Sequence, residues 1–174
     1  RWLLFISRSY FRYTMLRIKC LRLRIHHIAQ IGKLLRHKSM CCWRDALQHY
    51  NLWRDMDDIV ICDTREQAIE LAPDILTAAE APDAIFCVND HCAAGVLYAA
   101  QRLGVRVPED LAICGFSDAP LARTTTPMLT TVGQHGAEIG ERAMLCLLRR
   151  LDGDQRTPHT EMVCTDLIVR GTTK

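Results

Sequence analysis

The chain has 174 residues, of which 49% are hydrophobic and 24% charged, and its formal net charge is +2. A chain of this length and composition can hold one domain of ordinary size with a sizeable core. No apolar run approaches the length of a transmembrane helix, and Leu3 to Ile6 is too short for the core of a signal peptide.

Nine cysteines raise the question of disulfides. Their number is odd, no two have the spacing CxxC, and Cys62, Cys87 and Cys114 lie within apolar runs typical of strands. Free thiols in such runs are usually buried, and they stay reduced in the cytoplasm. We therefore expect a cytoplasmic protein without a disulfide framework.

Positive charge is concentrated at the start of the chain. Residues 1–38 contain ten of the 22 Lys and Arg residues and no acidic residue, which leaves 12 basic and 20 acidic residues in the rest of the chain. Over residues 1–24, basic and apolar side chains nearly alternate, as in an edge strand, but no cap or turn residues frame the segment. It is either a basic arm that binds nucleic-acid phosphates or the lead sequence of a truncated or out-of-frame gene, and the pattern favours the second.

After this segment, apolar periodicity predicts alternating strands and helices. The first are a strand from His27 to Gly32, a helix from about Met40 to Tyr50, a strand from Ile59 to Cys62 and a helix from Glu66 to Ala79 that is interrupted at Pro73. Next come a strand from Ala84 to Val88, a helix from about His91 to Leu103 that stops at Gly104, and a strand from Leu111 to Cys114. A helix from Ala137 to Leu151, a polar loop over residues 154–160 and a strand from Glu161 to Val169 complete the series.

Turn-forming or polar residues follow four of these strands directly. They are Gly32, Asp63, Asn89-Asp90 and Ser117-Asp118. Alternating strands and helices indicate a parallel sheet, and open parallel sheets bind ligands at the carboxyl ends of their strands. The pattern therefore predicts a ligand site at these strand ends.

Short motifs in one central stretch carry a resemblance to a known family. In order, they are Asn89-Asp90 with Ala93, Ala94 and Gly95, then Gly104 to Asp110, then Gly115 to Asp118, and finally Pro127 before Leu129 to Val132. In this order they resemble the effector-binding core of the lactose-repressor family of bacterial transcription regulators, and the gluconate-operon repressors look most similar. The resemblance implies an α/β fold, with a parallel sheet in a three-layer αβα lobe that is one half of a periplasmic-binding-protein-like fold. It assigns residues 25–174 to the C-terminal lobe of a sugar-effector domain and leaves residues 1–24 without a match.

The same resemblance implies which residues bind a small sugar or sugar-acid effector. Asp90 matches a carboxylate that accepts hydrogen bonds from sugar hydroxyls in the family, and Asn89 lies beside it. Ser117 and Asp118 follow the next strand, and Gln134 matches a polar residue that borders the effector. Residue patterns alone leave simpler roles open, because Asp90 can be only a helix N-cap and Ser117-Asp118 only a turn.

Two family positions for effector contacts are changed in this chain. Ser39 stands where the family has an effector-binding Arg, and Thr64 stands where some members have a ring-stacking aromatic side chain. An aromatic platform contributes about 1 kcal/mol to a stacked ligand. Its loss makes a purine effector less favoured than a sugar or a sugar acid.

Relatives use this lobe to form two-fold dimers, and the helix His91 to Leu103 is the expected interface. It has more apolar residues than one buried stripe requires. We expect Val96, Ala99, Ala100 and Leu103 to face the sheet, which leaves Ala94, Leu97, Tyr98 and nearby Cys92 for a homodimer contact.

These features favour a fragment of a cytoplasmic, DNA-binding transcriptional repressor that binds an effector and dimerises. Operator DNA is expected to bind only through a headpiece that is not present in this chain. No cofactor, metal, membrane partner or catalytic residue is expected, because neither GxSxG nor HExxH nor a phosphate-binding glycine loop occurs. The alternatives are a stand-alone periplasmic-type sugar-binding protein and an inactive remnant of a truncated or frameshifted gene.

The basic segment generates one prediction about DNA. Ten positive charges without a base-reading motif should give weak, salt-sensitive binding to any duplex through counterion release. In a competition shift assay at about 150 mM salt, where the Debye length is about 8 Å, deletion of residues 1–24 should abolish this binding. A thousandfold preference for one operator sequence would contradict the prediction.

Overall fold

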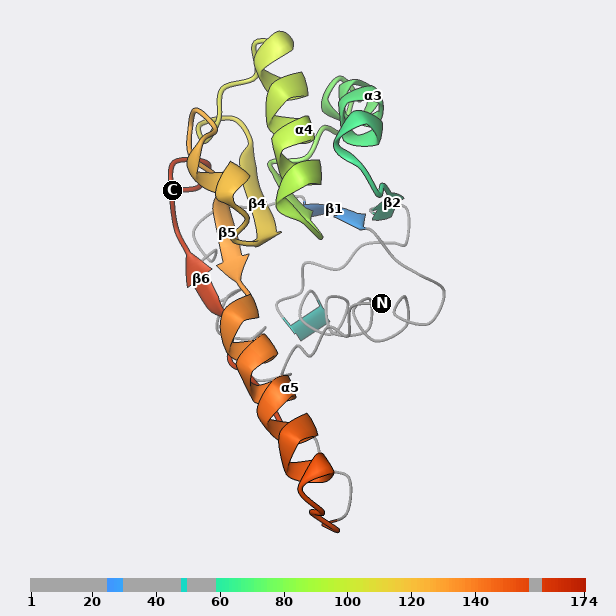
Figure 1. The fold of residues 1–174 in the computed structure, drawn as a ribbon. Coiled ribbons are helices and arrows are strands. Elements are labelled where there is room, and N and C mark those ends of the chain that lie inside the picture. The colour runs from blue at the N-terminus through green and yellow to red at the C-terminus, as the bar shows by residue number, and fades with distance from the viewer. Residues whose placement is uncertain (1–24, 30–47, 50–58, 157–160) are drawn as a thin grey trace.

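The computed structural model describes residues 25–29, 48–49, 59–156 and 161–174. Their strands form one six-stranded sheet in the order β2-β1-β3-β4-β5-β6 (Figure 1). The strands are β1 (Ile25–Ala29), β2 (Ile59–Ile61), β3 (Ala84–Cys87), β4 (Ala112–Ser117), β5 (Thr130–Gly133) and β6 (Asp166–Ile168). The helices are α3 (Arg65–Leu76), α4 (Asp90–Arg102), the 3-10 turn η2 (Pro120–Arg123) and α5 (Gly136–Leu151).

The sheet is parallel except at one margin. Strands β1 to β5 pair in parallel, and only β6 runs antiparallel to its neighbour β5. The carboxyl ends of β1 to β5 therefore meet at one edge, which we call the strand-end edge. The predicted α/β fold with a mostly parallel sheet is confirmed. The second helical layer of the expected three-layer lobe is not among the described residues.

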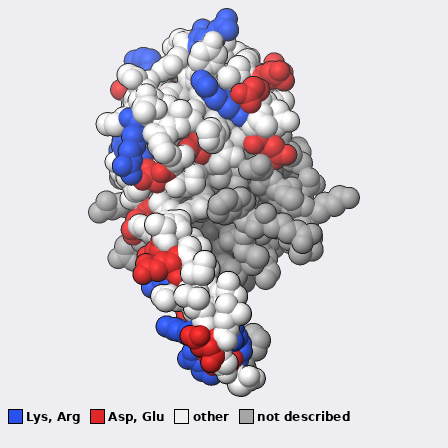
Figure 2. All heavy atoms as spheres, viewed as in Figure 1, with Lys and Arg blue, Asp and Glu red and all other residues white. Residues whose placement is uncertain are grey.

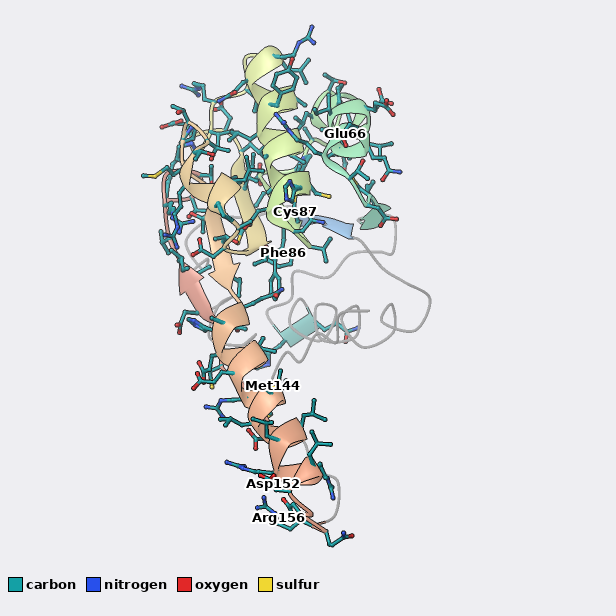
Figure 3. All side chains as sticks on the ribbon, in the orientation of Figure 1. Glu66, Phe86, Cys87, Met144, Asp152 and Arg156 are labelled. Carbon is teal, nitrogen blue, oxygen red and sulfur yellow. The ribbon has the colours of Figure 1, made fainter. Side chains whose placement is uncertain are left out.

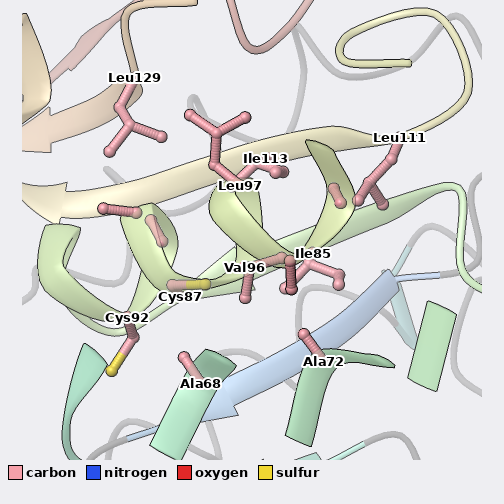
Figure 4. Close-up of a cluster of buried hydrophobic side chains, with 14 of the residues drawn as sticks. Ala68, Ala72, Ile85, Cys87, Cys92, Val96, Leu97, Leu111, Ile113 and Leu129 are labelled. Atoms are coloured by element: carbon pink, nitrogen blue, oxygen red, sulfur yellow. The ribbon is translucent and has the colours of Figure 1, made fainter. Parts of the chain in front are cut away.

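Helices α3 and α4 cover one face of the sheet and form the core with it (Figure 4). The core residues are mostly small or branched aliphatic side chains, including Ala68 and Ala72 of α3, Val96 and Leu97 of α4, and Ile85 and Ile113 of the sheet. Full burial of a Val, Leu or Ile side chain stabilises a fold by about 1.5–3 kcal/mol. The two helices are therefore held to the sheet mainly by apolar contact.

Helix α4 is buried on both flanks, and this corrects the predicted orientation of its side chains. It lies between α3 and η2, and nine of its 13 residues are buried. Ala94 and Leu97 are only 5% and 3% exposed, and Cys92 is fully buried. Leu103, predicted to face the sheet, is exposed. A helix packed on two sides needs the wide apolar surface that suggested a subunit contact. Of the four residues predicted for that contact, only Tyr98 is exposed.

Three element bounds differ from the prediction. Helix α3 continues through Pro73, because Ala72 and Leu76 are buried on either side of the proline and hold the turn in place. Strand β4 extends to Ser117, since Gly115, Phe116 and Ser117 pair with β5. Strand β6 has three residues, and each of them pairs with a residue of β5.

Other predicted elements are confirmed within one or two residues or lie outside the described chain. Strands β2 and β3 and helix α5 match the predicted segments. Strand β1 begins two residues before the predicted start at His27. The predicted helix from Met40 to Tyr50 lies outside the described residues, apart from the helical residues 48 and 49.

Helix α5 differs from the other helices because none of its residues is buried. It extends from the end of β5 and projects away from the sheet and from α3 and α4 (Figure 1). Across the described residues, no helix is both long enough and apolar enough to cross a membrane.

Close packing of α3 on α4 generates a stability prediction. A Cβ atom added at Gly95 would lie 2.6 Å from the Arg65 carbonyl oxygen and 2.7 Å from the Ala68 Cβ. Gly95→Ala should therefore lower the free energy of unfolding by about 1–3 kcal/mol, as overpacked sites do. Gly140→Ala is the matched control, because a Cβ there meets open space and Ala is the better helix former. Urea denaturation measures both, and equal stability of the two variants would contradict the prediction.

Candidate functional site

The strand-end edge carries polar groups from four strands. Asp63 follows β2, Asn89 follows β3, Ser117 ends β4, and Gln134 follows β5. Asp63 is exposed, whereas the other three side chains are half-buried. The predicted site residues of β3, β4 and β5 are thus brought to the same edge by parallel pairing.

The N-terminus of α4 is capped by Asn89 and not, as the sequence suggested, by Asp90. The Asn89 side-chain oxygen accepts a hydrogen bond from the Cys92 backbone N–H at 2.7 Å, and Asn89 has extended backbone angles typical of an N-cap. Asp90 is the first helical residue. Its carboxylate is therefore available for contacts outside its own helix.

Asp90 is fully buried and is bonded by protein donors. Its Oδ1 accepts a hydrogen bond from the Thr131 hydroxyl at 2.6 Å. Its Oδ2 accepts the Ala119 backbone N–H at 2.7 Å and, at 3.5 Å, the Ser117 hydroxyl. A buried carboxylate is tolerated only when such donors replace water. Asp90 therefore links α4 to β5 and to the turn after β4.

Gly115 makes room for this carboxylate. A Cβ atom at position 115 would collide with Asp90 Oδ1 and would lie 3.3 Å from the Ala93 Cβ. Gly115 is in β4, directly under the first turn of α4, so the glycine is required by close approach and not by its backbone angles. The Gly115-Phe116-Ser117-Asp118 motif thus includes a spacing residue for Asp90.

The turn after β4 has an unusual backbone. Ser117 and Asp118 have φ angles of 113° and 51°, although neither is glycine. Backbone conformations of this kind cost about 1–3 kcal/mol each and persist only where surrounding contacts enforce them. The Asp90 carboxylate holds the backbone of this turn in place by accepting hydrogen bonds from Ala119 and Ser117.

Asp118 is held by two arginines. Its Oδ2 accepts a hydrogen bond from Arg123 and its Oδ1 one from Arg170, at 2.7 and 2.6 Å. Partial burial tends to raise the pKa of Asp118, but the two guanidinium groups outweigh burial and bring the pKa below its ordinary value. Asp118 and Arg170 are 13% and 12% exposed, so their pair is well shielded from water.

Sequence reasoning missed Arg170 and Thr131. Arg170 lies 52 residues from Asp118 and also donates to the Leu129 carbonyl oxygen. Thr131 lies 41 residues from Asp90. The motif from Leu129 to Val132 includes it, but that motif gave Thr131 no role of its own. No local sequence signal identifies either contact, because both depend on which strands become neighbours.

The last part of the edge contains Gln134 and His135. Gln134 is half-buried. His135 is exposed, and its Nε2 lies 2.9 Å from the Asp166 carboxylate. This pair joins the start of α5 to the start of β6.

A pair of thiols lies just behind the edge. The Sγ atoms of Cys62 and Cys92 are 3.7 Å apart, and both side chains are buried. Burial raises the pKa of Cys92 to about 12, so this thiol remains protonated at neutral pH. Cys62, Cys87 and Cys114 are buried free thiols, as predicted.

Comparisons with known proteins agree with this fold. The model of the periplasmic binding protein-like domain matches residues 25–173. The HTH-type transcriptional repressor CytR of Escherichia coli is 38% identical over 111 residues, which are 64% of this chain and 33% of the relative. The HTH-type transcriptional repressor PurR of Vibrio vulnificus is 34% identical over 65% of this chain and 33% of the relative. The chain therefore spans about a third of the length of these curated relatives.

Solved structures are similar over nearly the whole chain. A complex of the transcriptional regulator CelR with cellobiose has a TM-score of 0.83 and 25% identity, and the match covers 95% of this chain and 51% of that one. The transcription regulator CcpA of Lactococcus lactis has a TM-score of 0.85 over 97% of this chain and 63% of that one. At 24% identity, the likeness to CcpA concerns the fold alone.

A mostly parallel α/β sheet with polar residues at its strand ends defines the class as a ligand-binding α/β lobe. Within that class, the chain belongs to the periplasmic binding protein-like domain family. Both of these curated relatives are transcriptional repressors.

The Asp118 ion pairs generate a pH prediction. Since its pKa is lowered on folding, the carboxylate stabilises the fold above the ordinary Asp pKa, and this stabilisation is lost as the pH falls through the lower, folded value. Asp118→Asn should reduce the free energy of unfolding at pH 7 by about 2 kcal/mol, the usual size for hydrogen bonds to charged groups. The difference from wild type should start to shrink near pH 4.

The control for this prediction is Asp110→Asn. Asp110 forms an ion pair with Arg106 that is open to solvent, so its removal should change stability far less. Denaturant titrations of the three proteins between pH 7 and pH 3 provide the measurement. An Asp118→Asn effect that is independent of pH would count against the ion pairs as its source.

Proposed function

We propose that this chain is the effector-binding lobe of a LacI-type transcriptional repressor and that a small sugar or sugar acid binds at its strand-end edge. The observation that carries the proposal is the convergence of Asn89, Ser117 and Gln134 at one edge of a parallel sheet. Family membership supports it, and so does the cellobiose complex of one structural relative.

The accessible side chains suit a polyhydroxylated ligand. Amide groups of Asn and Gln both donate and accept hydrogen bonds, and the Ser117 hydroxyl does the same. Each sugar hydroxyl also donates and accepts, so such groups match a sugar better than they match an apolar molecule. A sugar acid, the effector class suggested by the resemblance to gluconate-operon repressors, would add a carboxylate that the neighbouring Arg123 can attract.

Asp90 and Asp118 belong to this proposed site mainly as supports. Asp90 positions Ser117 through its hydrogen bonds, and Asp118 is fixed to Arg123 and Arg170. Direct contact between Asp90 and an effector stays a prediction. It requires an effector hydroxyl to replace one of the three protein donors that now surround the carboxylate.

Regulation would follow from the difference in effector affinity between two arrangements of the protein. Operator DNA would be bound by a helix-turn-helix unit, as the names of the relatives indicate for those proteins. The exposed side of α4 is the proposed contact for a homodimer. Tyr98 is its accessible residue, whereas Leu97 and Ala94 would support it from beneath.

Effector binding is tested by calorimetric titration of the chain with gluconate and with glucose. One lobe offers few contacts, so we expect a dissociation constant of about 1 mM, which corresponds to about −4 kcal/mol. Gln134→Ala should weaken binding at least threefold, because it removes an accessible polar contact without altering the buried hydrogen bonds.

Gln155→Ala is the matched control, since Gln155 is exposed and lies beyond the far end of α5. It should leave the affinity unchanged. Absence of heat with both ligands at tens of millimolar, or equal affinities for wild type and Gln134→Ala, would contradict the proposed site.

A further inference from the structure

The two thiols behind the strand-end edge belong to elements that are distant in sequence. Cys62 directly follows β2, and Cys92 lies in the first turn of α4, 30 residues later in the chain (Figure 4). Their Sγ atoms are 3.7 Å apart, and both side chains are fully buried. The fold therefore places two nucleophilic groups side by side.

The surroundings of this pair favour a covalent bond between the two sulfur atoms. Cys92 Sγ also lies 3.8 Å from the Cys62 carbonyl oxygen and 3.7 Å from that of Thr64. Cys92 therefore packs directly against the backbone that carries its partner. The sulfur atoms of a disulfide are about 2 Å apart, so a further approach of less than about 2 Å closes the pair.

Other buried cysteines of the described chain have a simpler role. Cys114 Sγ lies 3.5 Å from the Gly115 carbonyl oxygen, and Cys87 of β3 lies among the apolar side chains of the core (Figure 3). Buried cysteines of this kind act as small hydrophobic residues. Direct contact between two thiols distinguishes Cys62 and Cys92 from them.

The thiol pair lies close to the surface, although both side chains are buried. Asp63 follows Cys62 directly, His91 precedes Cys92, and both of these neighbours are exposed. Strand β2 has three residues and lies at one margin of the described sheet, and charged side chains lie on the surface over α3 in Figure 2. Short marginal elements open locally more readily than a core. A small oxidant can therefore reach the sulfur atoms without unfolding of the domain.

We propose that Cys62 and Cys92 form a reversible disulfide on reaction with a hydroperoxide, and that this bond fastens the first turn of α4 to the chain after β2. The Cys62 thiolate attacks one oxygen of the hydroperoxide, the O–O bond breaks, and Cys62 becomes a sulfenic acid. The hydroxide or alkoxide that leaves takes up the proton that Cys62 has lost.

The second step closes the disulfide. The Cys92 sulfur attacks the sulfenic sulfur of Cys62, the S–O bond breaks, and the Cys92 proton leaves with that oxygen as water. The two thiols have then lost two electrons, and the hydroperoxide has been reduced to water or to an alcohol. Small thiols reverse the bond by thiol–disulfide exchange.

Cys62 is the thiol that reacts first. Burial raises the pKa of Cys62, but the hydrogen bonds with Cys92 and at the Thr64 backbone act in the opposite direction. Burial raises the pKa of Cys92 to about 12, so Cys92 keeps its proton and can donate it in the hydrogen bond to Cys62. Thiolates, and not thiols, are the nucleophiles in these reactions. Since the pKa of Cys62 still lies above its ordinary value, oxidation at neutral pH should be slow.

Peptide mapping of the whole chain after treatment with hydrogen peroxide tests for the bond. Cleavage before Asp and after Lys or Arg places the three neighbouring cysteines in separate peptides, with Cys62 in residues 58–62, Cys87 in residues 83–89 and Cys92 in residues 90–102. In the folded protein we expect a link between the Cys62 and Cys92 peptides, and dithiothreitol should remove it.

The exposed thiol of Cys164 shows whether the oxidant has acted. Complete oxidation of Cys164 without a link between Cys62 and Cys92 would overturn the proposal. Links from Cys62 to Cys87 in equal amount would overturn it too, because they would indicate random pairing.

Serine variants test the order of the two steps. In Cys92→Ser no second thiol is available, so the Cys62 sulfenic acid should accumulate and be trapped by dimedone. In Cys62→Ser, Cys92 should stay unlabelled, because its pKa keeps it protonated. Serine keeps a donor beside the Thr64 carbonyl oxygen in both variants. Labelling of Cys92 but not of Cys62 would overturn the assignment of Cys62 as the first nucleophile.

Cys114→Ser is the matched control for the loss of a buried thiol, and it should leave the link between Cys62 and Cys92 unchanged. The link closes a loop of 30 residues, which restricts the unfolded chain. Oxidation should therefore raise the urea midpoint of unfolding of wild type and of Cys114→Ser, but not that of Cys92→Ser. An unchanged wild-type midpoint with the link fully formed would overturn the proposed fastening of α4 to the chain after β2.

Discussion

The buried carboxylate of Asp90 is the contact on which the strand-end edge depends. An unpaired carboxylate in a protein interior is very costly, so its position is tolerated only because Thr131, Ala119 and Ser117 all donate to it. These donors come from β5 and from the turn after β4. One charged group thus fixes the first turn of α4 relative to two strands, and it holds the strained backbone at Ser117 in place.

A second set of contacts holds β4 and β5 at the ends that lie away from the strand-end edge. Thr172 is fully buried, and its hydroxyl accepts from the Thr130 backbone N–H and donates to the Ile113 carbonyl oxygen. Arg170 reaches from the same segment to Asp118 and Leu129. The C-terminal residues therefore connect the starts of β4 and β5 with the turn at the strand-end edge. The strands next to the polar side chains of the proposed effector site are therefore held in place at both ends.

Helices α4 and α5 illustrate opposite uses of apolar sequence. In α4 the apolar residues are small or are shared between two flanking elements, and Gly95 allows α3 to approach so closely that little apolar surface remains. In α5 the apolar residues occupy more than one side of the helix, and none of them is buried. Apolar content alone therefore does not distinguish a central core helix from a helix with an open face. The number of elements packed against the helix decides it.

Local patterns in the chain were enough to place β2, β3, α4 and α5 and to indicate a parallel sheet, because short apolar runs and helical spacing are properties of neighbouring residues. The motif from Asn89 to Asp118 was enough to suggest the family. Spatial neighbours explain what these patterns did not reveal. Asp90 is a buried carboxylate that joins α4 to β5 and to the turn after β4, and Asn89 is the helix cap. The reason is that Thr131 and Ala119 approach the Asp90 carboxylate only after β4 and β5 pair. Likewise, Arg170 meets Asp118 across 52 residues, and Leu97 is buried because α4 has a neighbour on each side. Such contacts depend on which strands and helices become adjacent, a property of the tertiary fold that residues close in sequence do not encode.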